Sequence, residues 1–158
     1  MAERRVVKQS CSCPCGASRF ELDGEPIGRF FCHCLICQAV NKRAYADVTT
    51  FWARSVRLAG DCALDFRRHR RFPGLDRGMC PKCAAPVVEF MRPPPLPRVA
   101  FIPAQSFADR AALPPPRRHI FYHRRVADVA DAVAKTSGYW PSELFVAGMI
   151  FADAIGAG

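Results

Sequence analysis

The sequence predicts a mainly β, antiparallel protein that forms one domain, with helices only near its C-terminal end. Three observations support this fold class. The length of 158 residues is that of one ordinary domain. Short stretches of alternating polar and apolar residues are separated by proline and glycine, and helical periodicity begins only near residue 126. Apolar residues make up 50% and charged residues 23% of the chain, which excludes a wholly disordered protein.

The first expected strand, residues 17–22, alternates polar and apolar side chains, which is typical of a half-buried strand. A turn at 23–26 leads into a returning strand at 27–32. Residues 44–51 include three β-branched residues in a row, which favour a third strand. Further strands are expected at 56–58, 63–66, 86–91, 98–102 and 119–123, with loops at 71–74, 92–97 and 113–116.

Helices are expected at 126–135 and 142–155, the second beginning just after Pro141. We therefore divide the chain into a basic lead-in (1–8), a domain (9–138) and an apolar C-terminal extension, expected to be helical (139–158). The apolar stretch 144–158 is shorter than the about 20 residues that span a membrane, so no membrane partner is expected. Residues 1–10 are charged and lack the apolar core of a secretory signal, which favours the cytoplasm.

Nine cysteines are the main candidate functional residues, and seven of them lie in three clusters. The clusters are Cys13-Pro14-Cys15, Cys32-His33-Cys34-Leu35-Ile36-Cys37 and Cys80-Pro81-Lys82-Cys83. Disulfide frameworks usually spread their cysteines through a small secreted domain, whereas closely spaced pairs each supply two of the four ligands of zinc. The clusters therefore predict zinc binding.

Seven thiols are one too few for two closed four-thiolate sites, which leaves two arrangements open. In the first, Cys13, Cys15, Cys80 and Cys83 hold a structural zinc, and Cys32, Cys34 and Cys37 hold a second zinc with a free position. In the second, both sites are closed, and Cys11, Cys62 or His33 supplies the missing ligand. A free position distinguishes catalytic zinc from structural zinc. Either arrangement predicts two zinc ions per chain.

The three clusters, with Gly16-Ala17-Ser18-Arg19-Phe20 after the first and His119-Ile120-Phe121 near the end, resemble the glutathione-dependent formaldehyde-activating enzyme family, which includes centromere protein V. The resemblance extends over residues 9–130 and includes the order and separation of the clusters. It implies a β-tent fold, in which zinc staples small antiparallel sheets together.

The same resemblance implies a structural zinc on Cys13, Cys15, Cys80 and Cys83, and a catalytic zinc on Cys32, Cys34 and Cys37. It implies a carbon–sulfur lyase that joins glutathione, as co-substrate, to formaldehyde. The product would be S-hydroxymethylglutathione. A related small thiol is the other substrate class that we consider.

His33, Cys11 and Cys62 have two interpretations each. His33 is either a proton carrier beside the open zinc or, as we favour, a histidine behind the ligands or on the surface. Cys11 and Cys62 are expected to be small buried apolar residues if they are not ligands.

The formal net charge of +9 and the arginine runs favour an anionic partner. The runs are 4–5, 67–71, 117–118 and 124–125. The alternative function is therefore a non-catalytic zinc-stapled module that binds nucleic acid or another polyanion, although we favour a solvated loop as the explanation of the runs. A third hypothesis is an oligomer formed through residues 144–155.

Overall fold

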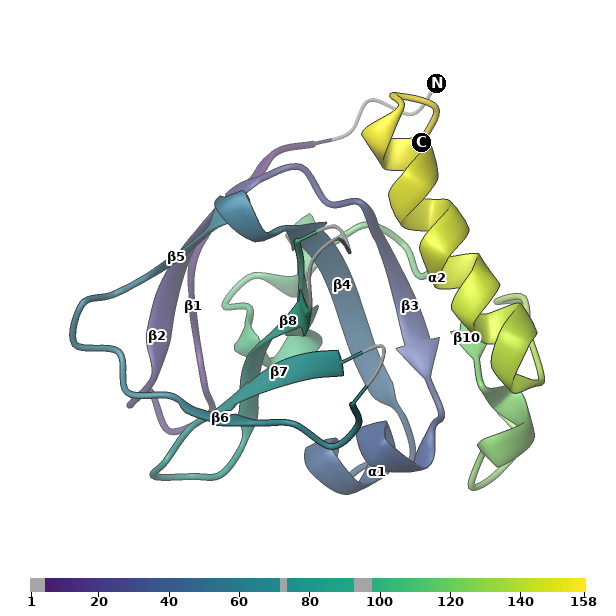
Figure 1. The fold of residues 1–158 in the computed structure, drawn as a ribbon, viewed down its shortest axis with the longest axis horizontal. Coiled ribbons are helices and arrows are strands. Elements are labelled where there is room, and N and C mark those ends of the chain that lie inside the picture. The colour runs from purple at the N-terminus through teal and green to yellow at the C-terminus, as the bar shows by residue number, and fades with distance from the viewer. Residues whose placement is uncertain (1–4, 72–73, 93–97) are drawn as a thin grey trace.

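The computed structural model describes residues 5–71, 74–92 and 98–158, and they form a mainly β fold with two helices (Figure 1). The strands are β1 (Val7–Ser12), β2 (Arg19–Gly24), β3 (Gly28–Cys32), β4 (Ala46–Trp52), β5 (Val56–Leu58), β6 (Asp65–Arg67), β7 (Gly74–Met79), β8 (Pro86–Arg92), β9 (Val99–Pro103) and β10 (His119–Ile120). The helices are α1 (Leu35–Asn41) and α2 (Tyr139–Ala154). The predicted fold class is confirmed.

The strands form two sheets, a small one in the order β1-β2-β5 and a large one in the order β10-β3-β4-β9-β8-β7-β6. All the pairings between named strands are antiparallel except that of β10 with β3. Strand β2 shows the predicted alternation, because Phe20 and Leu22 are buried while their neighbours are more exposed. The two sheets enclose one hydrophobic core between them.

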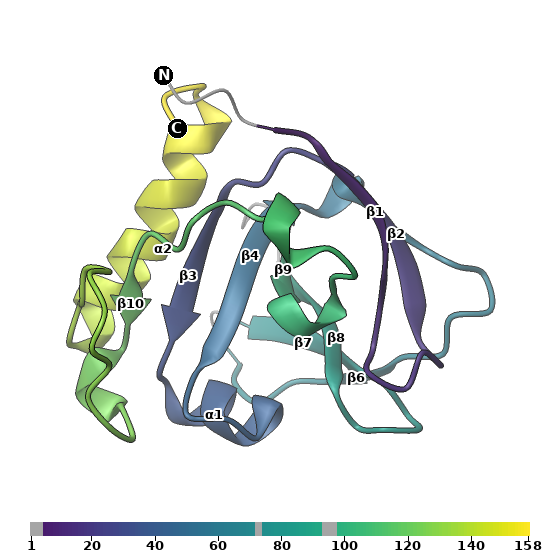
Figure 2. The same cartoon turned by 180° about the vertical axis from the view of Figure 1, so that it is seen from behind.

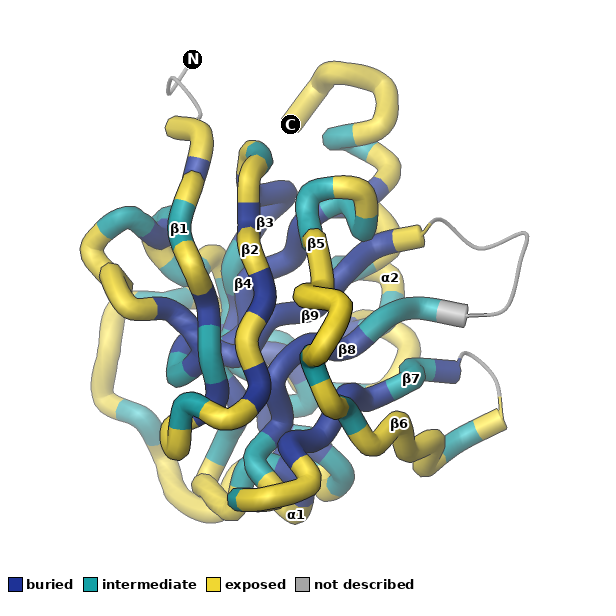
Figure 3. The backbone as a smooth tube through the Cα atoms, turned by 90° about the vertical axis from the view of Figure 1, so that its left-hand side faces the viewer, coloured by how far each residue is buried: buried dark blue, intermediate teal, exposed yellow. Residues whose placement is uncertain are grey.

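A second hydrophobic core lies on the other side of the large sheet, and strand β9 contributes to both. Ala100 and Ile102 pack into the first core, and Val99 and Phe101 pack into the second. Successive side chains of a strand point to opposite faces, so a strand covered on both faces is apolar at every position. Figure 3 shows β9 and much of β4 as buried tube.

Helix α2 packs along the β3 and β10 edge of the large sheet, as the two opposite views show (Figures 1 and 2). It buries Met149 and Ile150 in the second core. The helix approaches β3 at Gly28, where an added Cβ would lie 2.4 Å from the Met149 sulfur. The described residues contain no helix long and apolar enough to cross a membrane.

Three elements were not predicted. Strand β1 begins at Val7, within the expected lead-in, and β7 begins at Gly74, within an expected loop. Two glycines and two charged residues gave β7 no strand signal, yet it pairs along its whole length with β8. Helix α1 is only seven residues long and overlaps the second cysteine cluster. Residues 1–4, 72–73 and 93–97, within the expected lead-in and two expected loops, lie outside the described residues.

The helix predicted at 126–135 is wrong, and the strand predicted at 119–123 is limited to β10. After β10 a short 3-10 turn, Tyr122–Arg124, leads into an extended segment, residues 125–137, which we name the strap and which returns beside β10. His119 N–H donates to the Ala134 carbonyl, and Thr136 N–H donates to the His119 carbonyl. The Tyr122 hydroxyl accepts from Val129 N–H. These bonds satisfy backbone groups that a helix would otherwise have paired internally.

Candidate metal centres and the adjoining cavity

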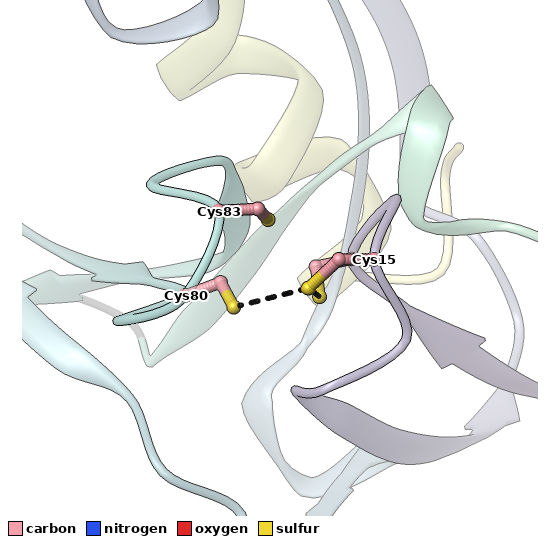
Figure 4. Close-up of side chains that lie close together, drawn as sticks. Cys15, Cys80 and Cys83 are labelled. Carbon is pink, nitrogen blue, oxygen red and sulfur yellow. Dashed lines mark hydrogen bonds between the residues drawn. The ribbon is translucent and has the colours of Figure 1, made fainter.

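Two separated turns bring four thiols together, which we name the four-thiol cluster: Cys13, Cys15, Cys80 and Cys83. The first pair lies in the turn between β1 and β2, where Gly16 adopts a φ of +76°, and the second lies in the turn between β7 and β8. Figure 4 shows the labelled thiols from these two turns pointing toward a common centre. The cluster thus joins the small sheet to the large one.

The four-thiol cluster suits zinc in both donor type and spacing. Tetrahedral zinc with Zn–S bonds of about 2.3 Å places its sulfurs ~3.8 Å apart. The Cys13 and Cys15 sulfurs are 3.5 Å apart, and those of Cys15 and Cys80 are 3.8 Å apart. Although burial raises the pKa of Cys80, hydrogen bonds from Ser18 and from nearby backbone amides lower it to about 6. Cys80 therefore favours the thiolate form that binds metal.

The three-thiol cluster, Cys32, Cys34 and Cys37, lies where β3 ends and α1 begins. Cys34 caps the helix, and its sulfur accepts a hydrogen bond of 3.3 Å from Cys37 N–H. Hydrogen bonds from the Cys32 and Cys37 thiols lower the pKa of Cys34 to about 3. Three soft ligands on one side of an ion suit zinc and leave a fourth position for another ligand.

The candidate extra ligands Cys11, Cys62 and His33 do not join either cluster among the described residues. Cys11 is fully buried in the first core, where burial raises the pKa of its thiol to about 12. It is a small buried residue, as one interpretation predicted. Cys62 is half-buried in the loop before β6.

His33 is buried, not on the surface, and it begins a chain of polar contacts that ends at the strap. Its Nε2 lies 2.8 Å from His119 Nδ1, and His119 Nε2 lies 2.9 Å from an Asp131 carboxylate oxygen. Because the Asp131 carboxylate accepts a hydrogen bond from His119 Nε2–H, His119 Nδ1 is left to accept a hydrogen bond from His33 Nε2–H. Burial lowers the pKa of His33 to about 4, so the ring is neutral at pH 7. These polar contacts fix the His33 ring, which lies in sequence between the candidate ligands Cys32 and Cys34.

A cavity of about 320 Å³ opens beside the three-thiol cluster, and we name it the thiol cavity. All three thiols line it, together with Arg77 and Glu89 from adjacent strands β7 and β8. Arg77 Nε and a Glu89 carboxylate oxygen are 3.3 Å apart, and both side chains are less than a tenth exposed. Burial raises the pKa of Glu89. The positive charge of Arg77 contributes to the lowered pKa of Cys34 after the two thiol hydrogen bonds.

Sequence reasoning missed Arg77, Glu89, His119 and Asp131 as neighbours of the candidate site. Arg77 and Glu89 are twelve positions apart in sequence and become partners only through the β7–β8 register. A charge within an expected strand was the one available signal for Glu89, because a lone buried charge needs a partner.

Part of the positive charge of the arginine runs is neutralised by carboxylates of the chain itself. In the run 67–71, three arginines pair with acidic residues. The pairs are Arg67–Asp65, Arg68–Asp76 and Arg70–Glu143, with N–O distances of 2.8, 2.7 and 3.1 Å. In the last run, Arg125 pairs with Asp128 and lies over the Tyr122 ring. These contacts account for four of the arginines without a polyanion, and Arg4 lies outside the described residues.

The model of the glutathione-dependent formaldehyde-activating enzyme family matches residues 8–124, which include both thiol clusters, Arg77, Glu89 and His119. A search of curated proteins found no match. The matched segment spans most of the chain and carries the three cysteine clusters on which the resemblance rests. The chain therefore belongs to the glutathione-dependent formaldehyde-activating enzyme family.

Proposed function

We propose that the protein is a zinc-dependent carbon–sulfur lyase that makes and breaks the adduct between a small thiol and formaldehyde. The single observation that carries this proposal is the position of the three-thiol cluster in the wall of a cavity. A structural site has no need of a cavity beside it, whereas a catalytic site needs room for its substrate. Glutathione is the first candidate thiol, because the family is named for it.

The two clusters have different proposed roles. Cys13, Cys15, Cys80 and Cys83 would hold a structural zinc, and Cys32, Cys34 and Cys37 would hold the catalytic one. When bound by three thiolates, zinc supplies a position that keeps a substrate thiol in its nucleophilic thiolate form. In the synthetic direction the thiol sulfur forms a bond to the formaldehyde carbon, and the carbonyl oxygen gains the proton that the thiol loses.

The chain's own residues prepare this chemistry in two ways. Helix α1 and the end of β3 hold the three ligands on one side, because Cys34 caps the helix and Cys37 lies in its first turn. Arg77 places a buried positive charge beside the sulfurs, which offsets part of the negative charge that three thiolates concentrate. The apolar wall limits access of water to the thiol and the aldehyde.

We propose the cytoplasm as the compartment, because all nine cysteines are free thiols in the structure. We also propose that residues 9–138 form the zinc-binding domain and that residues 139–158 are an extension added to it. The family match ends at residue 124, and α2 begins after it at Tyr139.

The test is the rate of exchange between free thiol and hydroxymethyl thioether, measured by NMR with formaldehyde and glutathione or a small thiol. We expect the zinc-loaded protein to accelerate exchange over the buffer rate. We expect Cys34→Ser to lose that acceleration, while Cys62→Ser, outside both clusters, keeps it. No acceleration with any thiol, in protein that contains two zinc ions per chain, would exclude the proposed activity.

A further inference from the structure

The thiol cavity has a mainly hydrocarbon wall. Half of the residues that line it are phenylalanine, leucine, isoleucine, valine or methionine. Phe30, Val48, Phe101 and Ile120 come from the large sheet, and Phe30, Phe101 and Ile120 are at most 5% exposed. A volume of about 320 Å³ lies at the small end of the range of about 300–1,000 Å³ for ligand pockets. The cavity therefore suits a compact ligand with an apolar body.

Four of the five arginine and glutamate side chains that line the cavity are paired with one another. Arg77 pairs with Glu89, and Arg70 pairs with Glu143. Arg124 is the third arginine of the wall, and among the described residues no carboxylate lies within ion-pair distance of it. Glutathione carries two carboxylates and one ammonium group. A second carboxylate would have to take Arg70 or Arg77 from its carboxylate partner, and the buried Arg77–Glu89 pair is the costly one to separate.

Helix α2 supplies the part of the wall that lies outside the family match. Tyr139, Glu143 and Val146 line the cavity, whereas the match ends at residue 124. The Tyr139 ring packs against Phe121 at 5.8 Å between ring centroids, and the Arg70 guanidinium lies over it at 5.3 Å. Glu143 is occupied by Arg70, so α2 adds apolar surface to the cavity and no unpaired charge.

We infer that the thiol bound in this cavity is a compact thiol with an apolar body and at most one anionic group, and that α2 selects it over glutathione. This inference rests on the proposed function and narrows its substrate class. The sulfur would lie at the three-thiol cluster, and the hydrocarbon body would lie between the sheet residues and Val146. A single anionic group would meet Arg124.

The test is calorimetric titration of the zinc-loaded protein with ethanethiol, butanethiol, hexanethiol and glutathione. Each methylene buried against the wall should tighten binding by about fourfold until the cavity is full. We expect butanethiol or hexanethiol to bind at least about tenfold more tightly than glutathione. In Val146→Asp this chain-length dependence should disappear, because a carboxylate then enters the apolar wall. Ala147→Asp is the matched control, because Ala147 is exposed, does not line the cavity and should keep the dependence.

The outcomes separate the two proposals. Tighter binding of glutathione without chain-length dependence would overturn the apolar substrate class and leave the lyase proposal intact. If Val146→Asp and Ala147→Asp show the same dependence of thiol binding on chain length, the role of α2 would be overturned. Failure of every thiol to bind protein that holds two zinc ions would overturn both the inference and the proposed function.

Discussion

Replacement of Arg77 by methionine should destabilise the protein strongly, because it leaves the Glu89 carboxylate buried without its partner. The Arg77 and Glu89 side chains are 6% and 8% exposed, so little water reaches Glu89 to replace the lost partner. Breaking such a buried pair typically costs about 3–5 kcal/mol of unfolding free energy. Arg77 Nε lies outside hydrogen-bonding geometry, and the contact is one of charge at 3.3 Å. We therefore expect a loss near the lower end, about 3 kcal/mol.

The double variant Arg77→Met, Glu89→Leu should recover most of this loss, because both charges are then removed from the buried wall. Urea unfolding, followed by circular dichroism at a fixed concentration of free zinc, measures all variants on one scale, since zinc release is coupled to unfolding. Arg67→Met is the control. Arg67 and Asp65 are about half exposed, so its loss should be below about 1 kcal/mol.

The pH dependence gives an independent check. Burial raises the pKa of Glu89, and removal of Arg77 should raise it further, because that guanidinium lowers it in the native protein. A carboxyl group with a raised pKa binds more protons in the folded state, so stability falls as pH rises. The loss of unfolding free energy in Arg77→Met should therefore be smaller at pH 6 than at pH 8. A loss under 1 kcal/mol, or a double variant that loses the sum of both single changes, would refute the buried-pair reasoning.

Four further predictions follow from the described contacts. Cys34→Ser should lower zinc from two ions per chain to one with the fold retained, as measured by elemental analysis and circular dichroism. His119→Leu should lower the free energy of unfolding by about 2–3 kcal/mol, measured by urea unfolding, because it leaves a buried His33 donor unpaired. Asp131→Asn should lower it by less, because the Asp131 side chain is 31% exposed. Ala84→Gly should stabilise the protein by about 0.5–1 kcal/mol in the same assay, because Ala84 has a φ of +59°. If α2 mediates an oligomer, Phe151→Asp should reduce the mass measured by light scattering, since Phe151 is 65% exposed. A monomer mass for both the native protein and the variant would contradict an oligomer formed through α2.

Local patterns predicted much of the sheet structure, because alternation indicates a strand with one covered face and a β-branched run indicates a strand with both faces covered. The alternation in β2 and the β-branched run in β4 are visible within a few residues. Strand β7 was missed because its strand character depends on its neighbour. Its Arg77 is tolerated only beside Glu89 of β8. The segment 126–135 has helix-forming residues, but the Ala134 carbonyl accepts from His119 N–H of β10 and Val129 N–H donates to the Tyr122 hydroxyl instead.

The thiol clusters were accessible from sequence because their members are two or three positions apart within each turn. Which pairs come together was implied by the family resemblance, and the structure brings Cys13 and Cys15 beside Cys80 and Cys83. The contact between His33 and His119 spans 86 positions and depends on the parallel pairing of β10 with β3. No local pattern reports such a contact, so the cavity wall and the histidine chain required the fold.

The position of β9 between the two cores makes the molecule a single cooperative unit. The first core holds Cys13 and Cys80 of the four-thiol cluster, and the second holds Cys32 and Cys37 of the three-thiol cluster. One strand lies against both, so disorder on one of its faces removes support from the other. Binding free energy gained at either cluster is therefore shared by the whole fold. If the four-thiol cluster binds zinc as proposed, that ion would help to keep the three-thiol cluster ordered without contacting the substrate.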